Sequence, residues 1–485
     1  MKILAHRWAL IVLLGFIFSA PLPGLANAAT CENPVATMVS VQGTVESQRV
    51  GESGWQPAVL DETFCAGDMI RVGENSRAAL ALASEAVMRL NENTAITLQE
   101  FKENRKSLLN LFKGAAHFIS RQPESLEVNT PYTIAGVRGT EFLIRVDADQ
   151  TFLSIFEGNV LAANKAGELN LTSGQSAVAE AGKALVLKVV ARPRDAVQWA
   201  LYYLPVMYDV PPDLIEQSPE SIRDPNLLTQ RAALLLNVGR VDAASADLER
   251  ALAMNPNNSD AQALQSVIAI VQNDRDKALA LARKAVDAAP KSATAWIALS
   301  YAKQARFDLE GARENLYEAT RVDPGNALAW ARLSEIQASF GELGRALDTA
   351  RKAESLAPNL SLTQKVMGFA YLNQVRIDEA KAAFEKAISL DQAAPLPRLG
   401  LGLAKIRQGD LNAGSREIEV AASLDPNNSL IRSYLGKTYY EEKRIGLDER
   451  EYKIAKELDP NDPTPWFYDA IAKQTTNRPV EAPQN

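Results

Sequence analysis

Residues 293–326 read ATAWIALSYAKQARFDLEGARENLYEATRVDPGN, and a unit of this length recurs through the second half of the chain. Prolines near the end of the units are spaced by 34 residues or by twice that interval, at Pro256, Pro290, Pro324, Pro358, Pro426 and Pro460. Five residues before each of these prolines, and before Gln392 in the doubled gap, stands an alanine, at Ala251, Ala285, Ala319, Ala353, Ala387, Ala421 and Ala455. A register kept over this many units indicates an internal repeat.

The repeat has the physical features of paired helices. A small residue at a fixed place lets two helix backbones approach closely, and a terminal proline ends the second helix. The period and these positions resemble the tetratricopeptide repeat, with Trp296, Trp330 and Trp466 at the aromatic position of the first helix and Phe384 at that of the second. The resemblance implies an all-α solenoid over residues 225–485. Its repeats run 225–258, 259–292, 293–326, 327–360, 361–394, 395–428 and 429–462, followed by a partial eighth.

Residues 29–192 follow a different pattern. Apolar and polar residues alternate in short runs such as AITLQE at 95–100 and TFLSIF at 151–156, and Gly, Asn, Asp and Ser separate the runs. A period of two indicates strands with one buried face, and the turn residues between them predict an all-β domain of many short strands. This spacing leaves open whether the strands form a sandwich or a short β-solenoid.

The first 28 residues predict an export signal. Lys2 and Arg7 precede the apolar run ALIVLLGFIFS at 9–19, and the small-residue pattern Ala-Asn-Ala ends at Ala28. Cleavage after Ala28 would place the mature protein in the periplasm, or outside the cell, of a Gram-negative-type envelope. The run is shorter than the roughly 20 residues of a membrane span. No later segment is long and apolar enough, so no transmembrane segment is expected after cleavage.

Cys31 and Cys65 are the two cysteines of the chain. Oxidising compartments favour pairing, so export predicts a disulfide between them. The alternative is two unpaired buried thiols.

Five blocks of the β-rich region carry a family resemblance: VQGTV at 41–45, NSRAAL at 75–80, VNTPYTIAGVRGTEF at 128–142, FEGNV at 156–160 and LTSGQ at 171–175. In this order they resemble the FecR family of exported signalling regulators. Members of that family that regulate sigma factors carry a cytoplasmic region and a membrane span before this domain. Here a signal peptide is predicted in that place, so direct control of a sigma factor is not expected.

Residues 193–224 connect the two domains. Apolar residues from Val197 to Tyr203 stand at helical spacing and end at Pro205, which predicts an amphipathic helix, and later prolines predict an extended run. We expect this helix to pack on the solenoid or the β-domain, because aromatic stripes at helical spacing are usually core. The chain therefore divides into a signal peptide (1–28), a FecR-type domain (29–192), a connector (193–224) and a solenoid (225–485).

Composition argues against several function classes. The formal net charge is −7 and no basic run occurs, so a nucleic-acid partner is not expected. Hydrolytic triads and most metal sites need histidine or cysteine. Signal cleavage would leave His117, expected at a strand surface or at the rim of the domain, as the one histidine. No phosphate-binding glycine loop and no Gly-x-Ser-x-Gly motif is present. We therefore expect no enzymatic activity, no metal and no small-molecule cofactor.

Two residues of the FecR-like motif are recognition candidates. Arg138 and Glu141 either pair with each other structurally or leave Arg138 to contact a partner. The glycines beside them, Gly136 and Gly139, are expected to permit a tight turn or a bulge.

The concave groove of the solenoid is the main candidate for partner binding. Positions 2, 5, 9 and 12 of each first helix share one face, which is expected to line the groove. In the third to sixth repeats the apolar residues at these positions are Ile297, Tyr301, Leu328, Leu362, Phe369, Leu372, Leu396, Leu399, Leu403 and Ile406. An exposed apolar stripe marks a partner site, and a hydrophobic helix or strand is the expected ligand. The alternative is that the superhelix or the connector covers these residues.

Together these patterns predict an exported, non-enzymatic scaffold that binds a protein or peptide of the cell envelope through its repeats, with the FecR-type domain as a second recognition module. The alternative is a signalling role, in which the β-domain senses an outer-membrane transporter or an envelope polymer and the repeats relay its state.

Overall fold

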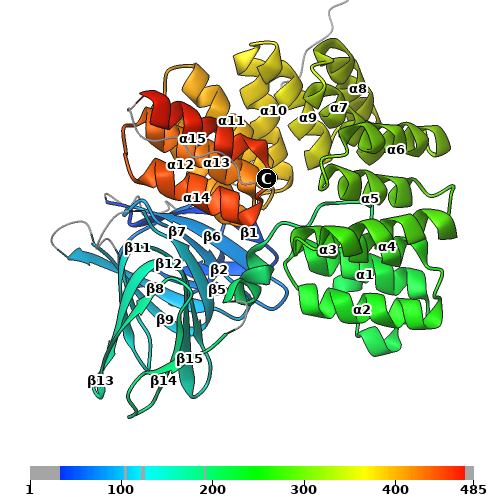
Figure 1. The fold of residues 1–485 in the computed structure, drawn as a ribbon. Helices are drawn as coiled ribbons and strands as arrows, with labels where there is room; N and C mark the ends of the chain where they lie inside the picture. Colours follow the sequence, from blue (N-terminus) through cyan, green and yellow to red (C-terminus); the bar gives the residue numbers. More distant parts are fainter. Residues whose placement is uncertain (1–32, 103–105, 122–125, 191–192, 476–485) are drawn as a thin grey trace, which may run out of the picture.

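The structure is a computed structural model that describes residues 33–102, 106–121, 126–190 and 193–475. The described part begins with a β-rich domain and continues into an array of helices, as the sequence predicts (Figure 1). The predicted signal peptide, its cleavage site at Ala28 and Cys31 lie outside the described residues. Cys65 takes part in a disulfide, and its pairing with Cys31 stays a prediction.

The β-domain forms a continuous, strongly curved sheet, in which antiparallel pairing dominates and β9 and β10 run parallel. Along its main path the strand order is β15-β14-β12-β11-β10-β9-β7-β6-β1-β4. The strands are β1 (Ala36–Gln42), β2 (Val45–Gln48), β3 (Gln56–Pro57), β4 (Thr63–Phe64), β5 (Met69–Val72), β6 (Arg77–Leu82), β7 (Val87–Leu90), β8 (Ala95–Lys102), β9 (Lys106–Ile119), β10 (Leu126–Asn129), β11 (Ile134–Val146), β12 (Gln150–Asn164), β13 (Gly167–Thr172), β14 (Ser176–Glu180) and β15 (Val186–Lys188).

Alternating apolar residues of these strands meet in one core. The rings of Phe118 on β9 and Phe142 on β11 stack 4.8 Å apart at its centre, and Met38 and Leu80 pack in the same buried cluster. Burying each such side chain stabilises the fold by about 1.5–3 kcal/mol. The predicted strands are present, but strands such as β7 and the first half of β12 are buried on both faces, because helices and the connector pack on the side away from this core.

The connector consists of short 3-10 turns, η1 (Pro193–Ala200), η2 (Pro212–Glu216) and η3 (Pro219–Ser221), in place of the predicted amphipathic helix. A kink at Val197, where the backbone leaves the helical φ/ψ region, interrupts η1. The apolar residues predicted to pack do so: Val197 and Leu201 are both buried.

Fifteen described helices form the array. They are α1 (Pro225–Asn237), α2 (Val241–Met254), α3 (Ser259–Val271), α4 (Arg275–Ala288), α5 (Ala293–Gln304), α6 (Leu309–Val322), α7 (Ala327–Ser339), α8 (Leu343–Leu356), α9 (Ser361–Asn373), α10 (Ile377–Leu390), α11 (Pro395–Arg407), α12 (Leu411–Leu424), α13 (Ser429–Glu441), α14 (Leu447–Leu458) and α15 (Pro463–Thr475). Odd-numbered helices are the first, or A, helices of the repeats, and even-numbered helices are the second, or B, helices. α15 is the A helix of the partial eighth repeat.

The small residues of the repeat act as predicted. A Cβ added at Gly368 would lie 2.5 Å from the ring of Phe384, and one at Gly400 would lie 2.3 Å from the same ring. Phe384 on α10 can therefore fill the space between α9 and α11 only because both A helices present glycine there. The indole Nε1 of Trp296 donates to Pro290 O at 2.9 Å, and that of Trp330 donates to Pro324 O at 2.8 Å. These bonds explain why tryptophan and proline recur together.

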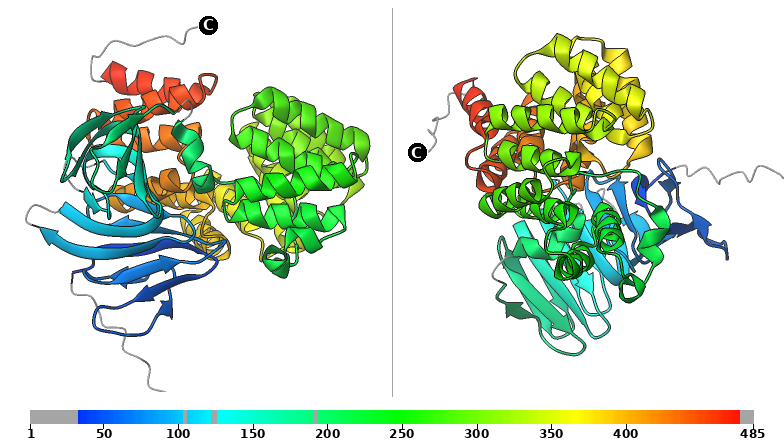
Figure 2. Two further views of the ribbon diagram at one scale, coloured as in Figure 1. Left: turned by 90° about the horizontal axis from the view of Figure 1, so that it is seen from below. Right: turned by 90° about the vertical axis from the view of Figure 1, so that its right-hand side faces the viewer.

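The array curves around the β-domain. Helices α11 to α14 lie over the sheet, while α1 to α4 stand beside it (Figures 1 and 2). The curvature brings early and late repeats together. In the second repeat, Asn273 donates to Leu458 O of the seventh repeat at 3.2 Å, and Arg275 pairs with Asp459 at 2.5 Å. The connector lies in the space enclosed by the two domains.

Candidate functional site

The two domains meet through a buried ion-pair network. Arg432 on α13 donates through Nη2 to Glu141 Oε2 at 2.6 Å, and through Nη1 to Glu451 Oε2 at 3.1 Å. Arg121 of the β-domain donates to the other oxygen of Glu451 at 2.6 Å. Burial alone would raise the pKa of Glu141, but the guanidinium groups of Arg432 and Arg194 lower it well below its ordinary value. Glu141 is therefore ionised, and the network is held together by alternating charges.

A bulge in the FecR-like motif positions Glu141. The register between β11 and β12 shifts between Arg138 and Glu141, as expected from the glycines of the motif. Gly139 and, on β12, Gly158 have positive φ angles, and a Cβ on Gly158 would lie 2.5 Å from the side chain of Thr140. The bulge redirects the strand, and Glu141 is then fully buried at the interface with α13.

Glu141 thus pairs with residues outside its own domain, Arg432 and Arg194. The side chain of Arg138 lies outside the described part of the chain, so its predicted role is untested. His117 is buried, and the prediction of a strand-surface position is wrong. Its Nε2 atom lies 3.4 Å from Glu141 Oε1, and burial lowers the pKa of the imidazole despite that carboxylate. It is therefore a neutral residue of the interface.

Two further buried arginines fix the connector between the domains. Arg77 on β6 donates to Trp199 O at 2.9 Å and to Asn237 O, at the end of α1, at 2.8 Å. Arg89 on β7 donates to Ala200 O and, at 2.7 Å, to Leu424 O at the end of α12. Carbonyl groups at a helix C-terminus carry partial negative charge and lack partners within the helix. Each arginine therefore satisfies carbonyls of both the connector and a helix end.

The connector also packs on the inner side of the array. Leu201, Tyr203 and Val206 belong to the same buried cluster as helices of the first five repeats. Tyr202 Oη donates to Asp391 Oδ2 at 3.2 Å, and Tyr208 Oη accepts from Ala327 N at 3.4 Å. The chain's own connector therefore occupies space that an external peptide would need.

The predicted apolar groove stripe is not exposed. Six of its ten side chains are buried: Ile297, Tyr301, Leu328, Leu362, Leu372 and Leu399. The other four are partly buried against hydrophobic clusters: Phe369, Leu396, Leu403 and Ile406. The prediction of an exposed stripe is wrong for two physical reasons. Successive A helices pack on each other along the array, and the connector lies against the same core.

A different surface of the repeats has an unusual backbone. The turn between helix A and helix B holds a residue with positive φ at the same place in each repeat, at Gly239, Asn273, Phe307, Gly341, Val375, Gly409 and Lys443. Glycine adopts this conformation freely, whereas other L-residues pay about 1–2 kcal/mol. Phe307 and Val375 nevertheless stand there, and their side chains are 44% and 69% exposed. We call this line of turns the turn edge.

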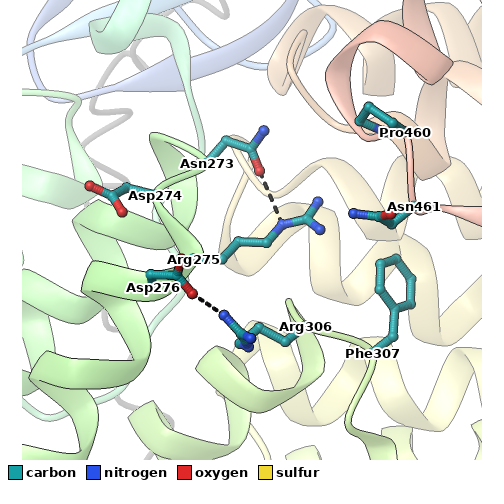
Figure 3. A pocket seen from close by; sticks show the side chains of 8 residues that line it. All are labelled: Asn273, Asp274, Arg275, Asp276, Arg306, Phe307, Pro460 and Asn461. Atoms are coloured by element: carbon teal, nitrogen blue, oxygen red, sulfur yellow. Dashed lines mark hydrogen bonds and ion pairs between the residues drawn. The ribbon is translucent and has the colours of Figure 1, made fainter. Parts of the chain in front are cut away.

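Phe307 also borders a cavity of about 690 Å³ where early and late repeats approach each other (Figure 3). Arg275 extends from the edge of α4 toward Asn461, with its Nε bonded to Asn273, while Arg306 pairs with Asp276 (Figure 3). The polar groups that Figure 3 shows are mainly engaged with each other, so the cavity contains no obvious catalytic set. Sequence reasoning missed it, because it depends on the curvature of the array.

Nothing among the described residues suggests metal chemistry or a membrane span. No group of three or more His, Cys, Asp or Glu residues in that part of the chain could hold a metal ion. None of the helices that the structure describes is both long and apolar enough to cross a membrane.

Family models match separate stretches of the β-rich region and of the helical array. Residues 68–161 match the family described as FecR protein, and residues 229–293 and 366–393 match tetratricopeptide repeat families. None of the curated proteins matches the chain.

Solved structures resemble separate parts of the chain. A proposed anti-sigma factor from Parabacteroides distasonis is 17% identical, with a TM-score of 0.25, and the match covers 28% of this chain and 67% of the other. A tetratricopeptide-repeat protein of Thermus thermophilus is 19% identical, with a TM-score of 0.35, over 38% of this chain and 100% of the other. The chain thus carries a FecR domain over residues 68–161, followed by tetratricopeptide repeats.

Proposed function

We propose that this protein is an exported, non-enzymatic scaffold that binds a protein or peptide partner of the cell envelope through the turn edge of its repeats. The FecR-type domain supports the array from within and adds a second recognition surface. The proposal keeps the repeats as the binding module. It moves the site from the concave groove, which the connector and the helix packing fill, to the turns around Phe307 and Val375, whose side chains are exposed.

The observation that carries the proposal is the strained, exposed backbone of Phe307 and Val375. Gly341, in the repeat between them, adopts the same conformation without a side chain. A large apolar side chain therefore costs folding energy at these turns and gains little from burial in return. A bound partner would explain why these residues stand there, because the contact would bury apolar surface that is otherwise exposed to water.

The buried charges favour a structural role over catalysis. Glu141, Arg432 and Glu451 lie at the domain interface and are paired with each other. A catalytic acid or base needs access to a substrate, and these groups have none. The non-enzymatic interpretation agrees with the families matched, which are typically non-catalytic.

The turn edge allows a test in which loss of binding cannot be caused by unfolding. Val375→Gly removes a largely exposed side chain and relieves the backbone strain, so this variant should fold at least as well as the wild type. Phe307→Gly also loses the contact between the ring and Arg275, so circular dichroism must show that this variant is folded before capture is compared. Tagged full-length protein would capture partners from envelope extracts with chemical cross-linking. The partner should be captured by the wild type, and less by each variant.

A matched control is Leu390→Gly, which removes an exposed apolar side chain at the end of α10, at the opposite end of that helix from the turn edge. It should leave capture unchanged. Undiminished capture by the Val375→Gly/Phe307→Gly double variant would refute the turn edge as the binding site.

A signalling role is the second candidate, and one observation favours it. The FecR-like motif is joined to the seventh repeat by the Glu141–Arg432 pair, so a ligand that strains the β-domain would also act on the repeats. Loss of a transcriptional response on deletion of the protein, and again in a full-length Glu141→Gln variant that still folds and still captures its partner, would support this role.

A further inference from the structure

Residues 184–190 of the β-domain, ALVLKVV, form an apolar strand edge that faces solvent. β15 ends the strand path of the sheet and pairs with β14 alone among the described strands. Val186 is 64% exposed, Leu187 53% and Val189 98%. β13, β14 and β15 lie at the end of the β-domain that points away from α11 to α14 (Figure 1), so those helices do not cover this segment. We call it the β15 edge.

The backbone of Leu187 is directed outward from the β15 edge. Alternate residues of a strand in an antiparallel sheet direct their backbone groups to the same side. Ile155 of β12 donates its N–H to Gln175 O at 2.9 Å, so two residues further, at Ala177, β14 again bonds to β12. The residues on either side of Ala177 bond to β15, where their partners are the residues on either side of Leu187. The N–H and C=O groups of Leu187 therefore point away from β14.

The other free edges of the sheet carry features that discourage pairing. β4 is two residues long, β3 contains Pro57, and β13 exposes the charged side chain of Glu168. Short strands, proline and charged side chains are the usual protection of a sheet edge. The β15 edge has a single charged residue, Lys188, among apolar ones. It is therefore the edge of this sheet that is best suited to accept a further strand.

We propose that the β15 edge binds an extended strand of another protein, which adds to the sheet beside Leu187. Outward backbone donors and acceptors on a strand edge are matched by those of another strand, so the edge itself specifies the form of its partner. Side chains of the added strand would alternate between two faces. One set would pack on Leu187, which shares the core side of the sheet with Ala177, and the other on Val186 and Lys188.

The charge of the edge narrows the partner further. The ammonium group of Lys188 favours an acidic residue at the neighbouring position of the added strand, and the exposed valines and leucine favour apolar residues at the other positions. The site would be the second recognition surface of the FecR-type domain. The proposal rests on the proposed function in taking the partner to be a protein, but it does not use the turn edge.

The first test selects a phage library of short random peptides on the full-length protein, with soluble Leu187→Pro protein as competitor. Proline here removes an outward N–H and no bond to β14, so the variant should keep its fold, which circular dichroism checks. Enriched peptides should combine apolar residues with one acid. In fluorescence anisotropy they should bind Leu187→Pro about tenfold more weakly than the wild type, the effect of one lost hydrogen bond. No enrichment, or equal affinity for both proteins, overturns the proposal.

Two control variants separate this site from the turn edge. Leu187→Ala keeps the outward N–H, so it should weaken peptide binding less than Leu187→Pro does. The Val375→Gly/Phe307→Gly double variant should bind the peptides as the wild type does, even if it no longer captures the partner of the turn edge. Loss of peptide binding in this double variant would assign the peptides to the turn edge and overturn the β15 site.

The second test needs no change in the protein. When a strand pairs along one edge, every second N–H faces its neighbour. Methylation of those peptide nitrogens should abolish binding, whereas methylation of the nitrogens between them should not. Equal tolerance at every position would mean that side chains alone hold the peptide, and would overturn strand addition.

Sedimentation velocity of the full chain tests the remaining occupant of the β15 edge. The wild type should sediment as Leu187→Pro does. A wild-type dimer that Leu187→Pro abolishes would assign the edge to a second copy of this chain and overturn the proposal of another protein.

Discussion

Arg432 Nη2 lies 2.6 Å from Glu141 Oε2, and both side chains are fully buried. The pair joins the FecR-like motif to the seventh repeat across 291 residues of sequence. A charge that is removed from water is stable only when its partner is also present. The two domains therefore depend on each other for the stability of this interface.

Replacing Arg432 with methionine should strongly destabilise the protein, because Glu141 and Glu451 then lose a shared buried partner. Breaking such a pair from one side typically costs about 3–5 kcal/mol. Urea denaturation followed by circular dichroism should show a lower midpoint, and limited proteolysis should cut the connector sooner. Arg376→Met, which breaks an exposed pair with Glu379, should leave both measurements unchanged. A midpoint unchanged by Arg432→Met would contradict the role given to the network.

Glu419 on α12 should make stability depend on pH. Burial raises its pKa to about 7, although the Tyr439 hydroxyl, which donates to it at 2.8 Å, and Arg444 act in the opposite direction. The ordinary value is 4.5, so between pH 4.5 and 7 the folded protein binds more protons than the unfolded chain. The free energy of unfolding therefore falls as pH rises through this range.

Glu419→Gln removes the ionisation but keeps an oxygen that can accept the hydrogen bond from Tyr439. Above pH 7 this variant should be more stable than the wild type by about 3 kcal/mol, and the difference should shrink toward pH 4.5. Urea denaturation at a series of pH values measures both quantities. Glu385→Gln, at an exposed position of α10, should show no such trend. A constant difference at all pH values would mean that packing, and not ionisation, separates the two proteins.

The sequence predicted the helical array well because its signals are local and periodic. A proline and an alanine in fixed register indicate where helix B ends and where it packs closely, and the repeat alanines from Ala251 to Ala455 are all fully buried. The β-domain followed similarly from alternation, and the bulge near Glu141 followed from its glycines.

The site could not be predicted in the same way. Arg77, Arg89 and Arg432 resemble ordinary surface arginines in the sequence, and each has a partner across the domain interface that lies more than a hundred residues away. Helical periodicity identifies the face on which Ile297 lies, but it does not reveal whether a neighbouring helix, the connector or water covers that face. One signal was available in the sequence: Phe307, Val375 and Lys443 occupy a repeat position that holds glycine in three other repeats.

Ile297→Ala should destabilise the protein, in contrast to the behaviour of a groove-surface residue. Its side chain is buried in the core shared by the connector and the A helices, and such truncations cost about 2–5 kcal/mol through lost burial and the cavity left behind. Thermal unfolding followed by circular dichroism measures the loss. Ile445→Ala, at an exposed position before α14, removes the same atoms and should have little effect. Equal stability of Ile297→Ala and the wild type would contradict the burial of Ile297 and support the original prediction that it lines an exposed groove.

Val375→Gly should stabilise the protein, which is unusual for the removal of an apolar side chain. The residue has a φ of 61° and is largely exposed, so truncation forfeits little burial. A left-handed conformation costs valine about 1–2 kcal/mol, which the variant no longer pays. Glycine loses more conformational freedom on folding, which lowers the free energy of unfolding by about 0.5–1 kcal/mol and offsets part of this gain. The net gain should be about 1 kcal/mol, measured as a higher urea midpoint. Gly341→Val is the reciprocal variant: its φ is 75° and no atom lies within 4 Å of the added Cβ, so the backbone alone should lower the midpoint by a similar amount. If Val375→Gly lowered the midpoint instead, the valine would contribute contacts within the fold, and it could not be explained as a residue held for a partner.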